Sequence, residues 1–171
     1  MSGKDVGIRK LLGLHYYVHD LERSRQFYTE RLGFAEIGRS SPALEQSGRQ
    51  RSLVFQAGEI VIACSTPLGA DSRSARYLSR HPDGIGTLAF EVDDIERTFG
   101  LLEERGATPI GDILRDKDDA GSVATFSITT PFGDTTFRFI ERRGYRGLYP
   151  GMQLYDAARG GSNPIGFSHI D

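Results

Sequence analysis

Two stretches of the chain, residues 17–34 (YVHDLERSRQFYTERLGF) and 91–108 (EVDDIERTFGLLEERGAT), resemble each other. When Asp20 is aligned with Asp94, six positions are identical, and each copy follows an alternating segment and contains a glycine near its end. Self-similarity at a long period indicates a duplicated structural unit. The sequence therefore predicts two similar modules within 171 residues.

Each copy begins as a strand that leads into a helix. Apolar and polar residues alternate through residues 13–18 and 87–92, which is typical of strands. Asp20 and Asp94 then occupy helix N-cap positions, each with a glutamate in the first turn, where the helix dipole favours negative charge. We therefore expect amphipathic helices to begin after both aspartates.

The two helices have predicted apolar stripes and predicted ends. Gly33 and Gly106 fit C-terminal stops, because glycine accepts the left-handed conformation that ends many helices. The stripes expected to pack against a sheet are Leu21, Phe27, Tyr28 and Leu32 in the first copy, and Ile95, Phe99 and Leu102 in the second.

Strand-like runs follow each helix and give each half the order β-α-β-β-β. The runs cover residues 34–40, 51–57, 59–65, 107–113, 122–130 and 135–142. This pattern predicts an α+β fold with two βαβββ modules. The expected organisation is a first module at 1–66, a helical linker at 67–83, a second module at 84–142, an irregular Gly- and Tyr-rich arm at 143–164, and a final segment at 165–171.

The end of the chain reads as a further strand. In residues 163–171 (NPIGFSHID), apolar and polar positions alternate from Ile165 to Asp171. A strand that lies outside both modules predicts that the polypeptide continues into another domain.

Composition narrows the function classes. The single cysteine, Cys64, excludes an internal disulfide and fits a reducing compartment. The formal net charge of −2 gives no electrostatic case for a nucleic-acid partner. No stretch approaches the roughly 20 apolar residues that span a bilayer, and the N-terminal residues lack the pattern of a signal peptide. We expect a cytoplasmic protein without a membrane partner.

The duplicated βαβββ module resembles the vicinal oxygen chelate superfamily, whose first helix is similar to residues 18–34 and whose last hairpin is similar to residues 130–141. Residues 75–96, 130–151 and 165–171 further resemble the N-terminal half of the 4-hydroxyphenylpyruvate dioxygenase family and of the related 4-hydroxymandelate synthases. The resemblance implies that the modules form a curved, barrel-like mixed sheet with its helices outside.

The resemblance also locates the superfamily's metal ligands. Each module has one on its first strand, seven residues before the helix-starting aspartate, and one on its last strand, four residues after the hairpin glycine. These positions hold Gly13, Thr87, Ile62 and Phe137. The side chains of Gly13, Ile62 and Phe137 cannot ligate a metal. A divalent metal is usually bound by several imidazole or carboxylate groups together. We expect the inherited metal site to be erased and this chain to hold no catalytic residue and no cofactor.

Other candidates for a metal site are few. Side-chain alternation puts His15 on the face of Gly13, Glu91 on that of Thr87 and Glu141 on that of Phe137, which leaves a displaced His/Glu/Glu site to be tested. In the dioxygenase family that the chain resembles, the first iron ligand directly follows the residues that match Ile170 and Asp171. His169 is a further candidate ligand if the alignment of this segment is displaced.

The remaining reactive side chains fit structural roles. His19 lies beside the first helix cap, and His81 precedes a proline at the end of the linker helix, so both are expected near the surface. Cys64 lies on an apolar strand and is expected to be a buried, inert thiol.

For the whole protein, the resemblance implies an Fe(II)-dependent dioxygenase that converts a 2-oxo acid to homogentisate in tyrosine catabolism. Its C-terminal catalytic domain would hold iron with two histidines and one glutamate. The present chain would pack against that domain and contribute to a homo-oligomer. Exposed apolar area is expected on residues 145–155 and on the outside of the sheet.

Two alternatives stay open. The whole protein could be a 4-hydroxymandelate synthase, because the residues that separate the two activities would lie in the other half. The chain could also be a complete small-molecule-binding protein of the bleomycin-resistance type, with its ligand in the cavity near His15 and Tyr17.

Overall fold

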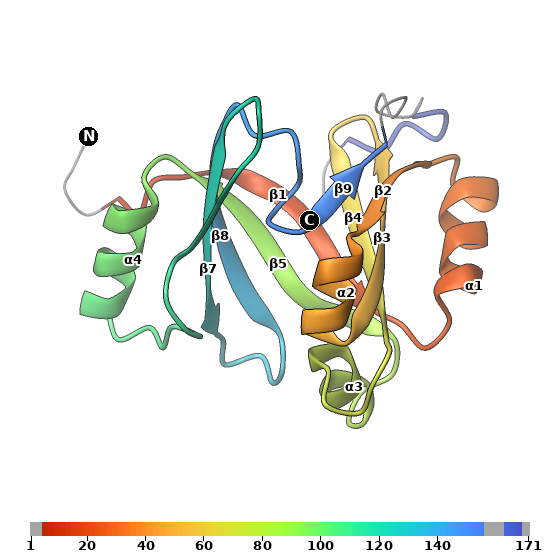
Figure 1. Ribbon diagram of the computed structural model, residues 1–171, viewed down its shortest axis with the longest axis horizontal. Coiled ribbons are helices and arrows are strands. Elements are labelled where there is room, and N and C mark those ends of the chain that lie inside the picture. The colour runs from red at the N-terminus through yellow and green to blue at the C-terminus, as the bar shows by residue number, and fades with distance from the viewer. Residues whose placement is uncertain (1–4, 156–162, 169–171) are drawn as a thin grey trace. The chain divides into compact units, whose positions relative to one another are not determined.

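The computed structural model of the chain describes residues 5–155 and 163–168. The elements follow in the order β1 (Ile8–Tyr17), α1 (Leu21–Gln26), the π-helical turn η1 (Phe27–Arg31), β2 (Ala35–Ser40), α2 (Pro42–Gly48), β3 (Gln50–Ala57), β4 (Ile60–Pro67), α3 (Arg73–Leu78), β5 (Gly84–Val92), α4 (Ile95–Glu104), β6 (Leu114–Lys117), β7 (Ser122–Thr129), β8 (Thr136–Arg143) and β9 (Met152–Leu154) (Figure 1). The predicted β-α-β-β-β order is present in both halves, and the α+β fold is confirmed.

The chain divides into two compact units. Residues 13–86, 151–155 and 163–168 form the α1 unit, and residues 5–12 and 87–150 form the α4 unit. The units are not contiguous in sequence, because β1 contributes residues to both and the arm after β8 is shared between them.

In the α1 unit the strands lie in the order β1-β4-β3-β2-β9. β1 and β4 pair in parallel, and the other neighbours are antiparallel. Helix α1 and the turn η1 cover one face of this sheet, where the Tyr28 ring stacks on Phe55 at 5.1 Å and meets Phe34 edge-on at 5.5 Å. These aromatic contacts hold the helix on the sheet.

In the α4 unit the strands lie in the order β6-β7-β8-β5, with β5 parallel to β8. Helix α4 packs against β7 and β8 (Figure 1). The buried core beneath it consists of Val92, Ile95, Ala124, Phe126, Ile128 and Phe139.

The predicted helix signals are confirmed. Asp20 accepts a hydrogen bond from the Arg23 amide at 2.9 Å, and Asp94 accepts one from the Arg97 amide at 3.0 Å. Gly33 and Gly106 have φ of 68° and 83°, the left-handed conformation expected after a helix.

The predicted apolar stripe of the first helix is wrong at Phe27, which is 50% exposed. The helix widens into a π-turn at Phe27, so the regular 3.6-residue spacing used for the prediction does not hold there. Tyr28 takes the sheet-facing position beside it.

The prediction of a full strand over residues 107–113 is also wrong. Only one isolated bridge, from Pro109 to Ile128, forms in that segment, and regular pairing begins at β6. The pairing stops beyond this bridge, where Gly111 takes a left-handed φ of 76° that a strand does not continue through. Helix α2 was not predicted; Ser41 caps it by accepting from the Leu44 amide at 3.1 Å.

The arm after β8 is more ordered than the sequence indicated. Its residues 152–154 form β9, which pairs with β2, while Leu148 and Tyr149 are buried. Arg138 lies over the Tyr149 ring at 4.8 Å from its centre. The expectation of an exposed apolar arm is therefore wrong for Leu148 and Tyr149, whereas Leu154 and Tyr155 are each 36% exposed, as expected.

The final segment does not form the predicted strand where the structure describes it. Residues 163–168 contain a turn held by two hydrogen bonds between Asn163 and Phe167. Phe167 contacts the Phe34 ring at 5.5 Å. Residues 169–171, and with them the candidate ligand His169, lie outside the described residues.

Candidate functional site

The four superfamily ligand positions do not converge within either unit. In the α1 unit Ile62 is the register partner of Leu14, so it points to the face opposite Gly13. In the α4 unit Phe137 is the partner of Leu88 and points away from Thr87. The Thr87 hydroxyl is already hydrogen-bonded to Thr136 at 3.0 Å. These positions supply no set of side chains that could hold a metal.

The displaced candidate site is also not assembled. Glu91 pairs with Arg142 at 3.3 Å on one face of the α4 sheet. Glu141 lies on the other face, where it accepts a hydrogen bond from the Ile95 amide at 2.8 Å. Because the two carboxylates point to opposite faces of this sheet, they cannot bind the same ion. Among residues 5–155 and 163–168, no three His, Cys, Asp or Glu side chains are placed to hold a metal ion.

His15 instead belongs to a row of polar side chains that crosses the α1 sheet. His15 Nε2 lies 2.6 Å from Ser65 Oγ, and Ser65 Oγ lies 2.5 Å from Ser52 Oγ. The Ser52 amide donates to Ser40 Oγ at 2.9 Å, and Ser40 Oγ donates to Glu45 Oε1 at 2.9 Å. The four residues from β1, β4, β3 and β2 are each at most 5% exposed, and we call them the polar belt.

The polar belt was missed in the sequence because its serines are far apart along the chain. Ser40 ends β2, Ser52 is the third residue of β3 and Ser65 the sixth residue of β4, and none of them belongs to a local motif. Their common face follows from the pairing of Ser52 with Ser65, which only the strand register reveals.

The other reactive side chains lie where the sequence placed them. His19 is exposed and pairs with Asp83 at 2.5 Å, and the His81 ring contacts Tyr77 at 4.7 Å. Cys64 is fully buried, and burial raises the pKa of its thiol to about 12. At neutral pH this thiol stays protonated and out of reach of reagents.

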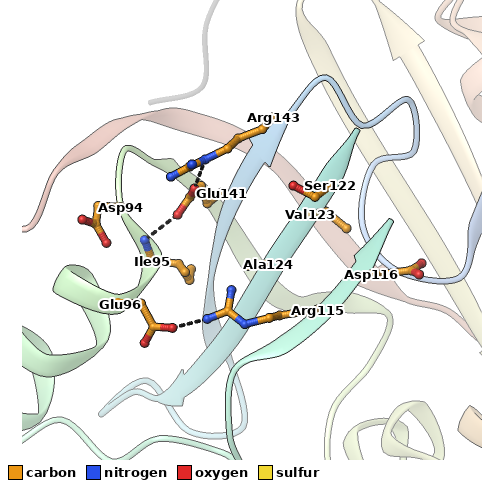
Figure 2. Close-up of a pocket in the computed structure, with 10 residues that line it drawn as sticks. All are labelled: Asp94, Ile95, Glu96, Arg115, Asp116, Ser122, Val123, Ala124, Glu141 and Arg143. Carbon is orange, nitrogen blue, oxygen red and sulfur yellow. Dashed lines mark hydrogen bonds and ion pairs between the residues drawn. The ribbon is translucent and has the colours of Figure 1, made fainter. Parts of the chain in front are cut away.

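A pocket of about 480 Å³ lies in the α4 unit at the start of α4 (Figure 2). Its charged side chains satisfy one another. Glu141 contacts both the Ile95 amide and Arg143, and Glu96 pairs with Arg115. The lining therefore offers no unpaired charge to a ligand through these groups.

A second pocket, of about 320 Å³, lies at the β2 side of the α1 unit. Its lining residues are Arg25, Arg39, Ser40, Pro42, Glu45, Arg51, Ser52, Leu53 and Tyr155. Two members of the polar belt, Ser40 and Ser52, contribute to this lining. The pocket thus brings three arginines together beside the end of the polar belt.

No helix in the described part of the chain is long and apolar enough to cross a membrane.

Comparison with known proteins identifies relatives in one named group. The chain is 30% identical to the 4-hydroxyphenylpyruvate dioxygenase of Dictyostelium discoideum over 162 residues, which covers 91% of this chain and 44% of the relative. It is 30% identical to the protein of the same name from Coccidioides posadasii over 156 residues, covering 82% and 38%. The chain therefore spans less than half the length of these relatives.

Solved structures share the fold at lower identity. A hypothetical protein from Bacillus halodurans aligns with a TM-score of 0.63 and 21% identity, covering 78% of this chain and 94% of that protein. The methylmalonyl-CoA epimerase of Mycobacterium tuberculosis aligns with a TM-score of 0.61 and 18% identity, covering 80% and 88%. At this identity the likeness concerns the fold alone.

The model of one protein family matches residues 10–135, most of the chain. The match includes both copies of the internal repeat, all of β1 after its first two residues, and β2 to β7 in full. The chain belongs to the Glyoxalase/Bleomycin resistance protein/Dioxygenase superfamily.

Proposed function

We propose that this chain is the N-terminal, non-catalytic domain of an enzyme of the 4-hydroxyphenylpyruvate dioxygenase type. One observation carries the proposal: the relative of that name from Dictyostelium discoideum matches 91% of this chain, while the chain spans only 44% of that relative. The rest of such a protein has room for a further domain, and residues 165–171 would lead into it.

The described residues at the superfamily's ligand positions do not fit an iron site. Gly13, Ile62 and Phe137 have no ligating atoms in their side chains, and the Thr87 hydroxyl is engaged by Thr136. Fe(II) in oxygenases is held by imidazole and carboxylate groups that leave positions open for substrate. We therefore assign no catalytic step and no cofactor to this chain.

The whole protein would be a cytoplasmic, homo-oligomeric Fe(II) dioxygenase acting on a 2-oxo acid in tyrosine catabolism. Its catalytic domain would bind the metal, the substrate and O₂. The present chain would support that domain by packing against it. The modules proposed at 1–66 and 84–142 would then be a metal-free duplicate of the catalytic fold.

The proposal is tested with two proteins, the 171-residue chain and the product of its native coding sequence. We expect the native product, loaded with Fe(II), to consume O₂ with 4-hydroxyphenylpyruvate and to release homogentisate, and the chain alone to do neither. Release of 4-hydroxymandelate instead would assign the synthase activity. Turnover by the chain alone would overturn the proposal.

A second candidate is a stand-alone small-molecule-binding protein of the bleomycin-resistance type. The pocket of about 320 Å³ in the α1 unit favours it, because this volume is at the lower end of known ligand sites. A native coding sequence that stops after Asp171 would favour this candidate over the first.

A further inference from the structure

The pocket of the α1 unit contains an arginine, Arg39, that has no hydrogen-bond or ion-pair partner among the described residues. Arg39 lies on β2 between β3 and β9 and is exposed. Within residues 5–155 and 163–168 its side chain makes no hydrogen bond and no ion pair. A guanidinium presents five donors in a fixed fork that matches carboxylate and phosphate oxygens.

The other two arginines of the pocket have defined positions. Arg25 is held by Glu36 at 2.7 Å and by Glu22 at 2.8 Å, so its charge is largely balanced. The ion pair between Arg51 and Glu45 is long, at 3.5 Å, and the Arg51 side chain is 57% exposed. Arg51 and Arg39 therefore retain donors for a ligand.

The charge of the lining differs from that of the chain. The full sequence has a formal net charge of −2, whereas the lining contains three arginines and one carboxylate, Glu45. Glu36, which does not line the pocket, accepts hydrogen bonds from Arg25 and from the Tyr155 hydroxyl, the latter at 2.6 Å. The local excess of positive charge lies on the side of Arg39 and Arg51.

The wall is fixed before any ligand arrives. Ser40 is paired with Met152 of β9, and the Tyr155 amide donates to the Ile37 carbonyl at 2.9 Å. Burial, followed by the hydrogen bond to Glu36, raises the pKa of Tyr155 to about 12, while Arg39 and Arg25 act in the opposite direction. The hydroxyl thus stays protonated near neutral pH and fixes one rim of the pocket.

We propose that this pocket binds a small molecule through an oxyanion group, a phosphate or a carboxylate, which accepts hydrogen bonds from Arg39 and Arg51. The pocket of about 320 Å³ limits the ligand to a small compound. Charge-assisted, two-point contacts to guanidinium groups are among the stronger hydrogen bonds available at an open site. This site is separate from the four superfamily ligand positions and does not depend on the proposed enzyme activity.

The test uses the 171-residue chain and two probes, inorganic phosphate and succinate, each titrated at constant ionic strength while amide NMR signals are followed. We expect saturable shifts at Arg39, Ser40, Arg51 and Tyr155 with a millimolar or tighter dissociation constant. A response to phosphate alone identifies a phosphate ligand, and a response to succinate alone identifies a carboxylate. Saturation by both supports the shared oxyanion chemistry.

Substitutions locate the binding. Arg39→Gln and Arg51→Gln should each weaken it about tenfold, the loss of one charge-assisted hydrogen bond. Arg31→Gln is the matched control, since Arg31 is an exposed arginine of the same unit that does not line the pocket. Saturation by neither probe, or an equal loss in the Arg31 variant, would overturn the proposal. Unchanged signals away from the pocket establish that the variants are folded.

Discussion

His15 Nε2 and Ser65 Oγ lie 2.6 Å apart in a part of the α1 sheet where both side chains are almost completely buried. The Ser65 hydroxyl also contacts Ser52 Oγ, so one oxygen links two neighbouring strands of the sheet. Buried polar groups are costly unless they are hydrogen-bonded. Each buried side chain of the polar belt is therefore stabilised by the hydrogen bond to its neighbour, so the energetic effects of substitutions within the belt should be coupled.

The first prediction concerns this coupling. Ser65→Ala removes one hydrogen-bond partner each of His15 and Ser52 and should lower the free energy of unfolding by about 2 kcal/mol. Ser52→Ala should act in the same direction. The double variant should cost about 1 kcal/mol less than the sum, because fewer partners are left unsatisfied. Urea denaturation of the three variants measures these terms.

Ser47→Ala is the control for the belt, because Ser47 is exposed and makes only a 3.4 Å bond to a carbonyl of its own helix. Its effect should stay within about 0.5 kcal/mol. Strictly additive effects of Ser52→Ala and Ser65→Ala would contradict the coupling.

A second prediction follows from the close approach of Gly86 to Tyr17. A Cβ at position 86 would overlap the Tyr17 ring, which is buried and held by a hydrogen bond from Arg73 at 2.8 Å. Gly86→Ala should therefore destabilise the chain by about 2 kcal/mol. Gly100→Ala in α4 is the matched control, since nothing lies within 4 Å of its added Cβ and alanine favours a helix. Thermal unfolding that ranks the two variants in the reverse order would refute the packing account.

A third prediction concerns pH. Asp118 accepts hydrogen bonds from the amides of Arg146, Gly121 and Ala120, which lower the pKa of its carboxyl below its ordinary value of 3.8. A lowered folded-state pKa contributes stability above the ordinary value and loses it as the pH falls through the folded-state pKa. Denaturation midpoints should therefore fall on acidification below about pH 4.

Asp118→Asn should remove this part of the acid sensitivity. Asp112→Asn serves as the comparison, because Asp112 is exposed and has no hydrogen bond or ion pair in the described ranges. If the stability of both variants falls with pH as that of the parent chain does, the Asp118 carboxylate does not contribute to the acid sensitivity of the fold.

A fourth prediction concerns the thiol. Because Cys64 is fully buried and its pKa is raised to about 12, it should react with a thiol reagent only when the chain unfolds. The rate of labelling should therefore follow the unfolding transition in urea. Rapid stoichiometric labelling of the native chain would contradict the burial of this strand.

The sequence predicted the fold well because its signals are local. Asp20 and Asp94 mark helix starts through a cap that involves only the next three residues. The alternation within single strands likewise identified β1, β5, β7 and β8. These local patterns are reliable because the local preference of each segment agrees with its place in the duplicated module.

Predictions failed where contacts between distant residues decide the structure. The π-turn at Phe27, the strand β9 on the edge of β2, and the faces of Glu91 and Glu141 depend on register and packing. The same is true of the pocket around Arg39, whose arginines come from three different elements. Counting along one strand cannot show which face a residue shares with a residue on another strand.

The central claim is that the chain has the superfamily fold while its described residues form no iron site. The most direct measurement is the iron content of the 171-residue chain after anaerobic incubation with excess Fe(II) and removal of unbound metal. The account predicts that iron is retained far below one ion per chain, with no change when His15 is replaced by Ala. One iron per chain, lost in the His15→Ala variant, would contradict it.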